Sequence, residues 1–114
     1  MLPKLYRLTK KKDFEVVFKK GKSIRERFLS FRVVKNHLQN SRFGFVVSKK
    51  VSTKATVRNK LKRRLRDSVA LALKNQPAHQ KQADVVMVAL PVAAQKEFLE
   101  IKSAVNNIFL ILNK

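Results

Sequence analysis

The chain has 114 residues with no cysteine, and its 27 lysines and arginines against 7 acidic residues give a formal net charge of +20. The lack of cysteine excludes disulfides, thiolate nucleophiles and cysteine-ligated zinc, and it fits a reducing compartment. So large a positive charge opposes compaction through self-repulsion and favours a polyanionic partner. A chain of this length buries about two-thirds of its surface on folding, so we expect one domain spanning residues 1–114.

The amino-terminal segment, MLPKLYRLTKKKDF, is charged and holds no apolar run as long as that of a signal peptide. No segment approaches the roughly 20 apolar residues that span a bilayer. The cations run from Lys4 to Lys102 through predicted strands, loops and helices alike, whereas a membrane binder more often gathers them on one helix or tail. We therefore expect a cytoplasmic protein that binds nucleic acid and has no membrane partner.

The first half of the chain predicts one helix and three strands. Thr9 is a candidate N-cap for a helix that reaches about Lys20 and stops at Gly21. In KSIRERFLSFRVVKN the apolar period becomes two, and a break at residues 25–27 divides a short strand from a longer one. NHLQNS forms the next turn. The strand in SRFGFVVSKK then alternates, with one side made of Phe43, Phe45 and Val47 and the other of Gly44, Val46 and Ser48.

The second half predicts a helix, a strand and a final helix. Thr53 or Thr56 can cap the second helix, which reaches about Lys74 before the loop NQPAHQKQ. ADVVMVALP is a continuous apolar run of strand length, as expected for a strand covered on one or both faces. The last helix runs from about Ala94 to Leu112. The order αβββαβα predicts an α+β fold, a two-layer sandwich of helices on a sheet.

The second predicted helix keeps its basic residues apart from its apolar ones. The apolar stripe consists of Val57, Leu61, Leu65, Val69 and Leu73, and the basic face of Arg58, Lys62 and Arg66 with Lys60, Arg63 and Arg64 beside them. Such a face can meet several phosphates, and arginine forks can also engage guanine edges. Asn59 is a mediocre helix residue, so its position suggests a specific contact with RNA or a neighbouring loop. A solvated basic face, with Asn59 incidental, is the alternative.

Three phenylalanines lie in strongly basic surroundings. Phe14 and Phe18 share a face of the first predicted helix, and Phe31 lies on a predicted strand. Aromatic rings flanked by cations are typical of grooves that stack unpaired bases and follow a phosphate backbone. Packing in the core is the usual role of a phenylalanine, so these residues by themselves leave both interpretations open.

Catalytic chemistry is scarce in this sequence. The seven carboxylates are scattered, whereas a two-metal nuclease site needs several that converge. His37 and His79 have no local acid or lysine partner of the kind that a general base uses. We find no phosphate-binding loop, nucleophile elbow or metal-ligand spacing. We therefore expect no catalytic residue, metal ligand or cofactor of the protein's own, and a reactive centre that a partner supplies.

The segment VSKKVSTKATVRNKLKRRLR, residues 47–66, resembles the signature of the bacterial ribonuclease P protein subunit, in which a strand ends in Ser-Lys-Lys and a helix opens with Arg-Asn-Arg. RLTKKKDFEVVFKKGKSI resembles the family's first helix and strand, RFGFVVSKK its central strand and DVVMVALP its last strand. The resemblance implies the αβββαβα order and a mixed four-stranded sheet with a left-handed crossover. The general rule for such connections is a right-handed crossover.

The resemblance also implies a division of labour. A catalytic RNA binds Mg²⁺ and removes the 5′ leader of precursor tRNA, while the protein, one monomer per RNA, binds both RNAs and assists cleavage. The chain would then be a single RNA-binding domain and an accessory subunit of an endoribonuclease. The alternative is a non-catalytic RNA-binding structural protein, such as a ribosomal protein or an RNA chaperone with a similar sandwich fold.

Site residues follow from the same resemblance. The set expected to bind the catalytic RNA is Arg58, Asn59, Lys60, Lys62, Arg63 and Arg66. Lys60 replaces the second arginine of the family motif, so it keeps the charge and loses the planar fork. The set expected to form a cleft for the single-stranded leader is Phe14, Phe18, Phe31, Ser48 and Lys49.

Overall fold

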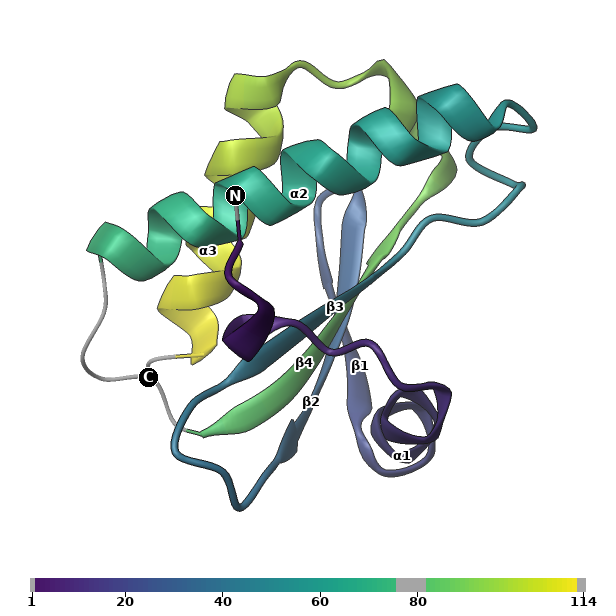
Figure 1. The fold of residues 1–114 in the computed structure, drawn as a ribbon. Helices are drawn as coiled ribbons and strands as arrows, with labels where there is room; N and C mark the ends of the chain where they lie inside the picture. The colour runs from purple at the N-terminus through teal and green to yellow at the C-terminus, as the bar shows by residue number, and fades with distance from the viewer. Residues whose placement is uncertain (1, 76–81, 113–114) are drawn as a thin grey trace.

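The structure is a computed structural model that describes residues 2–75 and 82–112. Three α-helices, two short 3₁₀ helices and one four-stranded sheet make up the described part of the chain (Figure 1). The elements are η1 Lys4–Tyr6, α1 Lys11–Lys20, β1 Lys22–Glu26, β2 Leu29–Lys35, β3 Arg42–Val46, α2 Ala55–Asn75, β4 Ala83–Ala89, η2 Pro91–Gln95 and α3 Phe98–Leu112. The predicted order αβββαβα is confirmed.

Helices α1 and α2 do not have the N-cap residues predicted from the sequence. Lys10, not Thr9, is the N-cap of α1, and its side chain makes no capping hydrogen bond. Helix α2 begins at Ala55, and the carbonyl of the preceding Lys54 accepts a 3.2 Å bond from the Arg58 N–H. Neither Thr53 nor Thr56 therefore occupies its N-cap position. Short polar residues favour caps statistically, but the local chain path decides which residue occupies one.

The last helix starts four residues later than predicted. Residues Pro91–Gln95 form a separate 3₁₀ turn, with the Ala93 N–H bonded to the Leu90 carbonyl at 2.9 Å. The Glu97 N–H then donates to Oε1 of Glu100 at 3.3 Å, as in half of a capping box, and α3 follows. Most of the predicted loop NQPAHQKQ, His79 included, lies outside the described residues.

The structure contains both breaks predicted on either side of β1, at Gly21 and at residues 25–27. Gly21 ends α1 in extended conformation, and a Cβ on it would lie 2.7 Å from the Val17 carbonyl oxygen, so a side chain would force the backbone apart. Arg27, with φ of 56°, lies in the tight turn between β1 and β2, where the sequence breaks its alternation. The two strands pair as an antiparallel hairpin.

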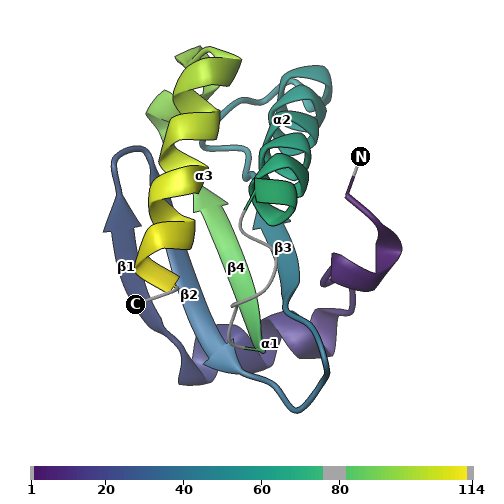
Figure 2. The ribbon, with the colours of Figure 1, turned by 90° about the vertical axis from the view of Figure 1, so that its left-hand side faces the viewer.

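The sheet has the order β1-β2-β4-β3, in which β3 pairs with β4 in parallel and the other pairs are antiparallel. In Figure 2 both parallel strands point upward with α2 in front of them, and the chain passes from β3 on the right to β4 on the left. This connection is left-handed, as the resemblance implies and against the general rule. The expected mixed four-stranded sheet is confirmed.

Helices α2 and α3 cover one face of the sheet, and α1 crosses the other (Figures 1 and 2). The main core lies under α2 and α3, where the Phe43 ring stacks on that of Phe109 with centroids 5.4 Å apart. Beneath α1 the fully buried residues are Leu8, Val17 and Val86. The expected sandwich is thus the sheet with α2 and α3, and α1 adds a partial third layer on the opposite face.

Candidate nucleic-acid interface

The basic face of α2 carries charges that no acidic side chain among residues 2–75 and 82–112 neutralises through an ion pair. Leu61, Leu65 and Val69 bury the opposite side of the helix in the main core. Among the described residues, none makes a side-chain hydrogen bond or ion pair with Asn59, Lys60, Lys62, Arg63 or Arg66. Cations held on a rigid helix without carboxylate partners favour an anionic partner from outside.

Arg58 differs from its neighbours because it is tied to the protein. Its Nη1 donates to the carbonyl of Ser52 at 3.0 Å and to that of Thr53 at 3.1 Å. These bonds hold the segment that enters α2 and leave other guanidinium donors unused. Arg64 is tied in a similar way, because its Nη1 donates to the Lys96 carbonyl at 3.2 Å. The set without protein partners is therefore smaller than the set of basic residues on the helix.

Two of the three predicted cleft aromatics lie together on α1. Phe18 is 40% exposed. Phe14 is half-buried, and its ring lies over Gly44 of β3, where an added Cβ would come 2.5 Å from Phe14 Cζ. Ser48 and Lys49 are exposed in the segment that follows β3, the strand that also carries Gly44.

The prediction that Phe31 lines this cleft is wrong. Its side chain is 0% exposed and lies in the main core, on the sheet face that α2 and α3 cover. The cause is the strand alternation: side chains two residues apart share a face, and Leu29, Phe31 and Val33 all belong to the core side of β2. A buried ring on that face cannot stack on a base bound beside α1.

Arg32, and not Phe31, is the β2 residue whose side chain lies beside Phe18 of α1. Its guanidinium carbon lies 5.5 Å from the centroid of the Phe18 ring, and its Nη1 donates to the carbonyls of Phe18 at 3.2 Å and Gly21 at 2.9 Å. One side chain thereby holds the carboxyl end of α1 and sets a cation beside an exposed ring. Strict alternation along β2 was the signal that could have found it, since Arg32 follows the buried Phe31.

A second arginine holds the amino end of α1. Arg42 donates to the two carboxylate oxygens of Asp84 at 2.7 and 2.9 Å, and its Nη1 lies 3.4 Å from Oδ2 of Asp13 in the first turn of α1. Asn36 adds a 2.8 Å bond to Asp84. The hydrogen bonds to Asp84 raise the pKa of Arg42 above its ordinary value, although partial burial opposes this. The link keeps α1 in register with β3 and β4.

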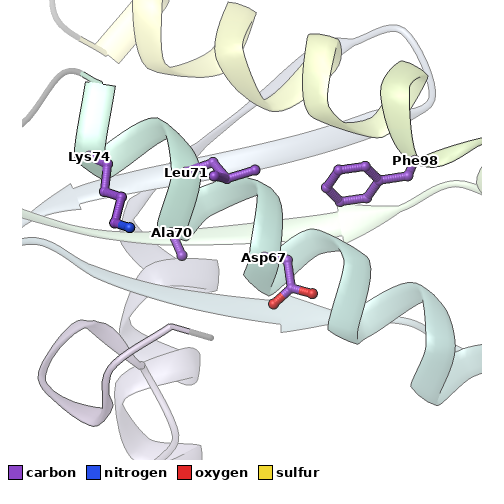
Figure 3. A pocket seen from close by; sticks show the side chains of 5 residues that line it. All are labelled: Asp67, Ala70, Leu71, Lys74 and Phe98. Carbon is purple, nitrogen blue, oxygen red and sulfur yellow. The ribbon is translucent and has the colours of Figure 1, made fainter.

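Away from these surfaces, a pocket of about 430 Å³ lies between α2 and α3, lined by Asp67, Ala70, Leu71, Lys74 and Phe98. Figure 3 shows Leu71 and the Phe98 ring pointing toward one another across it. Its single carboxylate does not suit a divalent cation, which prefers several oxygen ligands. In residues 2–75 and 82–112, no group of three or more histidine, cysteine or acidic side chains could hold a metal ion. None of the described helices is long and apolar enough to cross a membrane.

The chain is similar to known proteins along most of its length. The Ribonuclease P family model matches residues 2–113. The ribonuclease P protein component of Synechocystis is 45% identical over 91 residues, which are 79% of this chain and 71% of the relative. The RNase P protein of Staphylococcus aureus superposes with a TM-score of 0.79 at 28% identity, covering 96% of this chain and 98% of its own. For the protein from Thermotoga maritima the TM-score is 0.76 at 31% identity, over 90% and 93% of the two chains.

These similarities agree with what the residues show on their own. The match includes the basic face of α2 as well as the strands and helices around it. The mixed sheet and the helix order also agree with the solved neighbours, which share the fold over nearly the full chain. The chain therefore belongs to the ribonuclease P protein family.

Proposed function

We propose that this chain acts as the protein component of ribonuclease P, with the basic face of α2 on the catalytic RNA. The 5′ leader of precursor tRNA would bind along α1, at a site formed by Phe14, Phe18 and Arg32 that we call the α1 cleft. The observation that carries the proposal is the exposed Phe18 ring with the Arg32 guanidinium 5.5 Å from its centroid. A ring and a cation held together can stack on an unpaired base while neutralising a phosphate. The basic face supplies a separate attraction to RNA phosphates that does not depend on the RNA sequence.

In this proposal the RNA subunit, with its bound Mg²⁺, carries out hydrolysis of the phosphodiester. The described acidic residues do not fit a Mg²⁺ site of the protein's own, because they converge nowhere in sufficient number. The protein then contributes by positioning the substrate and by neutralising phosphates. We further propose that it works in the cytoplasm as one monomer per RNA.

A non-catalytic RNA-binding structural protein would use the same basic helix, so the charge of α2 does not separate the two functions. The family match favours the ribonuclease P subunit, and nothing in the comparisons favours the structural role. The α1 cleft is the discriminating surface, because a leader-binding protein needs it and a phosphate-binding scaffold does not.

The direct test is cleavage of precursor tRNA at low Mg²⁺ by a bacterial ribonuclease P RNA, with and without this protein, using long and very short leaders. We expect strong stimulation that grows when the leader is long enough to reach the cleft. Tight binding to a well-matched RNA with no stimulation of cleavage would assign the chain to the structural class.

Two variants separate the two surfaces. Phe18→Ala should leave assembly with the catalytic RNA unchanged and weaken the binding of substrates that carry a leader, by about tenfold from lost stacking. Arg63→Gln removes an exposed cation that has no partner in the described part of the chain, so it should weaken assembly and lower the salt dependence of binding. If both variants lowered assembly equally and neither depended on the leader, the two-surface assignment would be wrong.

A further inference from the structure

A pocket of about 220 Å³ opens at the β3 edge of the sheet, between the amino-terminal segment, α1 and α2. The side chains that matter are Arg7, Phe14, Phe45, Lys62 and Arg66, and we call this site the edge pocket. Figure 2 shows the amino-terminal segment running beside β3, outside the last strand of the sheet. The pocket therefore joins the α1 cleft, through Phe14, to the basic face of α2, through Lys62 and Arg66.

The charges in the edge pocket are positive and mostly free. Lys62 and Arg66 are half-buried, and neither forms an ion pair or a side-chain hydrogen bond with another described residue. Arg7 uses one donor, Nε, on the Leu2 carbonyl at 2.8 Å, which leaves its other guanidinium N–H groups available. None of the described lining residues is acidic. Partial burial makes unpaired cations costly, so the site favours an anionic group that enters from outside.

The pocket also presents flat apolar surface and open backbone. Phe45 is half-buried against the main core, and Phe14 against the small cluster under α1, so each leaves part of its ring uncovered. The Leu8 N–H donates to the Phe43 carbonyl at 2.9 Å, which marks the outer edge of β3. Two residues further on, the N–H and carbonyl of Phe45 face the same edge, where they can meet the polar rim of a planar ring.

We propose that the edge pocket binds one unpaired nucleotide of an RNA strand, with its base against Phe45 and Phe14 and its phosphate on Lys62, Arg66 and Arg7. A nucleotide combines in one unit the anion, the flat face and the hydrogen-bonding rim that the pocket accommodates. The inference rests on the proposed function, because the edge pocket joins the α1 cleft and the basic face of α2 into one continuous path for RNA. The strand comes either from the leader or from a single-stranded part of the catalytic RNA.

The test uses the full-length protein with three variants. Phe45→Leu keeps an apolar side chain against the core and removes the aromatic face, and Arg7→Gln removes a half-buried cation of the pocket together with its bond to the Leu2 carbonyl. Arg63→Gln is the matched control, because it removes one exposed charge of α2 that lies outside the pocket. A urea unfolding midpoint for each variant separates lost binding from lost folding; if Phe45→Leu is unfolded, Arg7→Gln decides.

Two binding measurements identify the source of the nucleotide. The first is affinity for the catalytic RNA alone, and the second is affinity of the assembled complex for precursor tRNAs that carry one abasic nucleotide at successive leader positions. If the leader supplies the nucleotide, one abasic position weakens binding to the wild type by about tenfold and has no effect with Phe45→Leu. If the catalytic RNA supplies it, Phe45→Leu and Arg7→Gln weaken assembly about tenfold whatever the leader.

Either pattern supports the edge pocket. The inference is overturned if Phe45→Leu and Arg7→Gln bind both RNAs within twofold of wild type, about 0.4 kcal/mol, while Arg63→Gln weakens assembly. It is also overturned if Arg7→Gln and Arg63→Gln weaken assembly equally while Phe45→Leu binds both RNAs like the wild type, because that result describes charge without a built site. Stimulation of cleavage by the wild type is measured in parallel, so a failure of the edge pocket is distinguishable from a failure of the proposed function.

Discussion

The two faces of the sheet are covered in different ways. Under α2 and α3 lies a continuous core of aliphatic and aromatic side chains, and the charged groups of α2 stay on its outer side. Under α1 the fully buried residues are Leu8, Val17 and Val86, and the helix is held at its ends by Arg32 and Arg42. A helix attached by polar groups at its ends leaves its aromatic side chains available for a ligand.

This difference explains why similar sequence surroundings lead to different roles. Phe18 and Phe31 both lie among lysines and arginines, yet one ring is 40% exposed and the other 0%. The face of the sheet that each ring meets decides its role, and local charge does not. The substitutions below test the contrast, beginning with the largest expected effect.

Phe31→Ala should destabilise the protein by about 3–5 kcal/mol, because it empties a large volume in the main core. Phe18→Ala on the other face should cost about 1 kcal/mol or less. Urea unfolding followed by circular dichroism measures both. A small loss for Phe31→Ala would contradict its placement in the core and restore it as a cleft residue.

Asp84→Asn should cost about 2–3 kcal/mol, since it removes the carboxylate that accepts two hydrogen bonds from the half-buried Arg42 and leaves only the longer contact with Asp13 as an ion pair. The Asp84 hydrogen bonds raise the pKa of Arg42, so this stabilisation is fully present below the ordinary arginine pKa and is lost only when the pH rises through the higher folded value. The stability difference between wild type and variant should therefore be constant between pH 7 and 9. Glu15→Gln, an exposed change on α1, is the control and should have little effect.

Arg32→Gln should lower stability by about 1 kcal/mol, because it removes the charged donor from the Phe18 and Gly21 carbonyls. Its larger effect should be on leader binding, since α1 loses its carboxyl-terminal attachment and Phe18 loses its neighbouring cation. Binding of precursor tRNAs with long and very short leaders measures this. Equal losses for the two substrates would place Arg32 outside the cleft.

Lys60→Arg should have the smallest effect, within about 0.5 kcal/mol in stability, because position 60 is exposed. It restores the second arginine of the family motif, so affinity for the catalytic RNA should stay the same or rise slightly. Assembly assays at several salt concentrations measure it. A clear loss of affinity would show that lysine is a specific adaptation at this position.

Sequence periodicity was sufficient for the element order and for the sides of β3, because alternation and helical spacing are local properties. Phe43 and Val47 are in the main core, while Gly44 and Val46 face α1. The same alternation applied to β2 would have placed Phe31 correctly. Alternation tells which residues share a face of the strand. Which face the helices cover, and so which phenylalanine is buried, is a tertiary property.

Local sequence patterns could not predict the polar attachments of α1 or the edge pocket. Arg42 reaches Asp84 across a sheet pairing whose partners are 42 residues apart, and Arg7 and Lys62, from distant segments, line the same pocket. No spacing rule connects such positions. The first follows from the parallel pairing of β3 with β4, and the second from the position of α2 and the amino-terminal segment at the β3 edge.

The position of β4 also decides when the sheet can be completed during synthesis of the chain. This strand is made after α2, yet it lies at the centre of the sheet between β2 and β3. Its alternate residues supply both layers, Val86 beneath α1 and Val85 and Met87 beneath α2 and α3. A nascent chain that ends at Asn75 lacks the strand that both layers need, although its β1–β2 hairpin is local. We therefore expect α1 and α2 to reach their packed positions on the sheet only after β4 has been made.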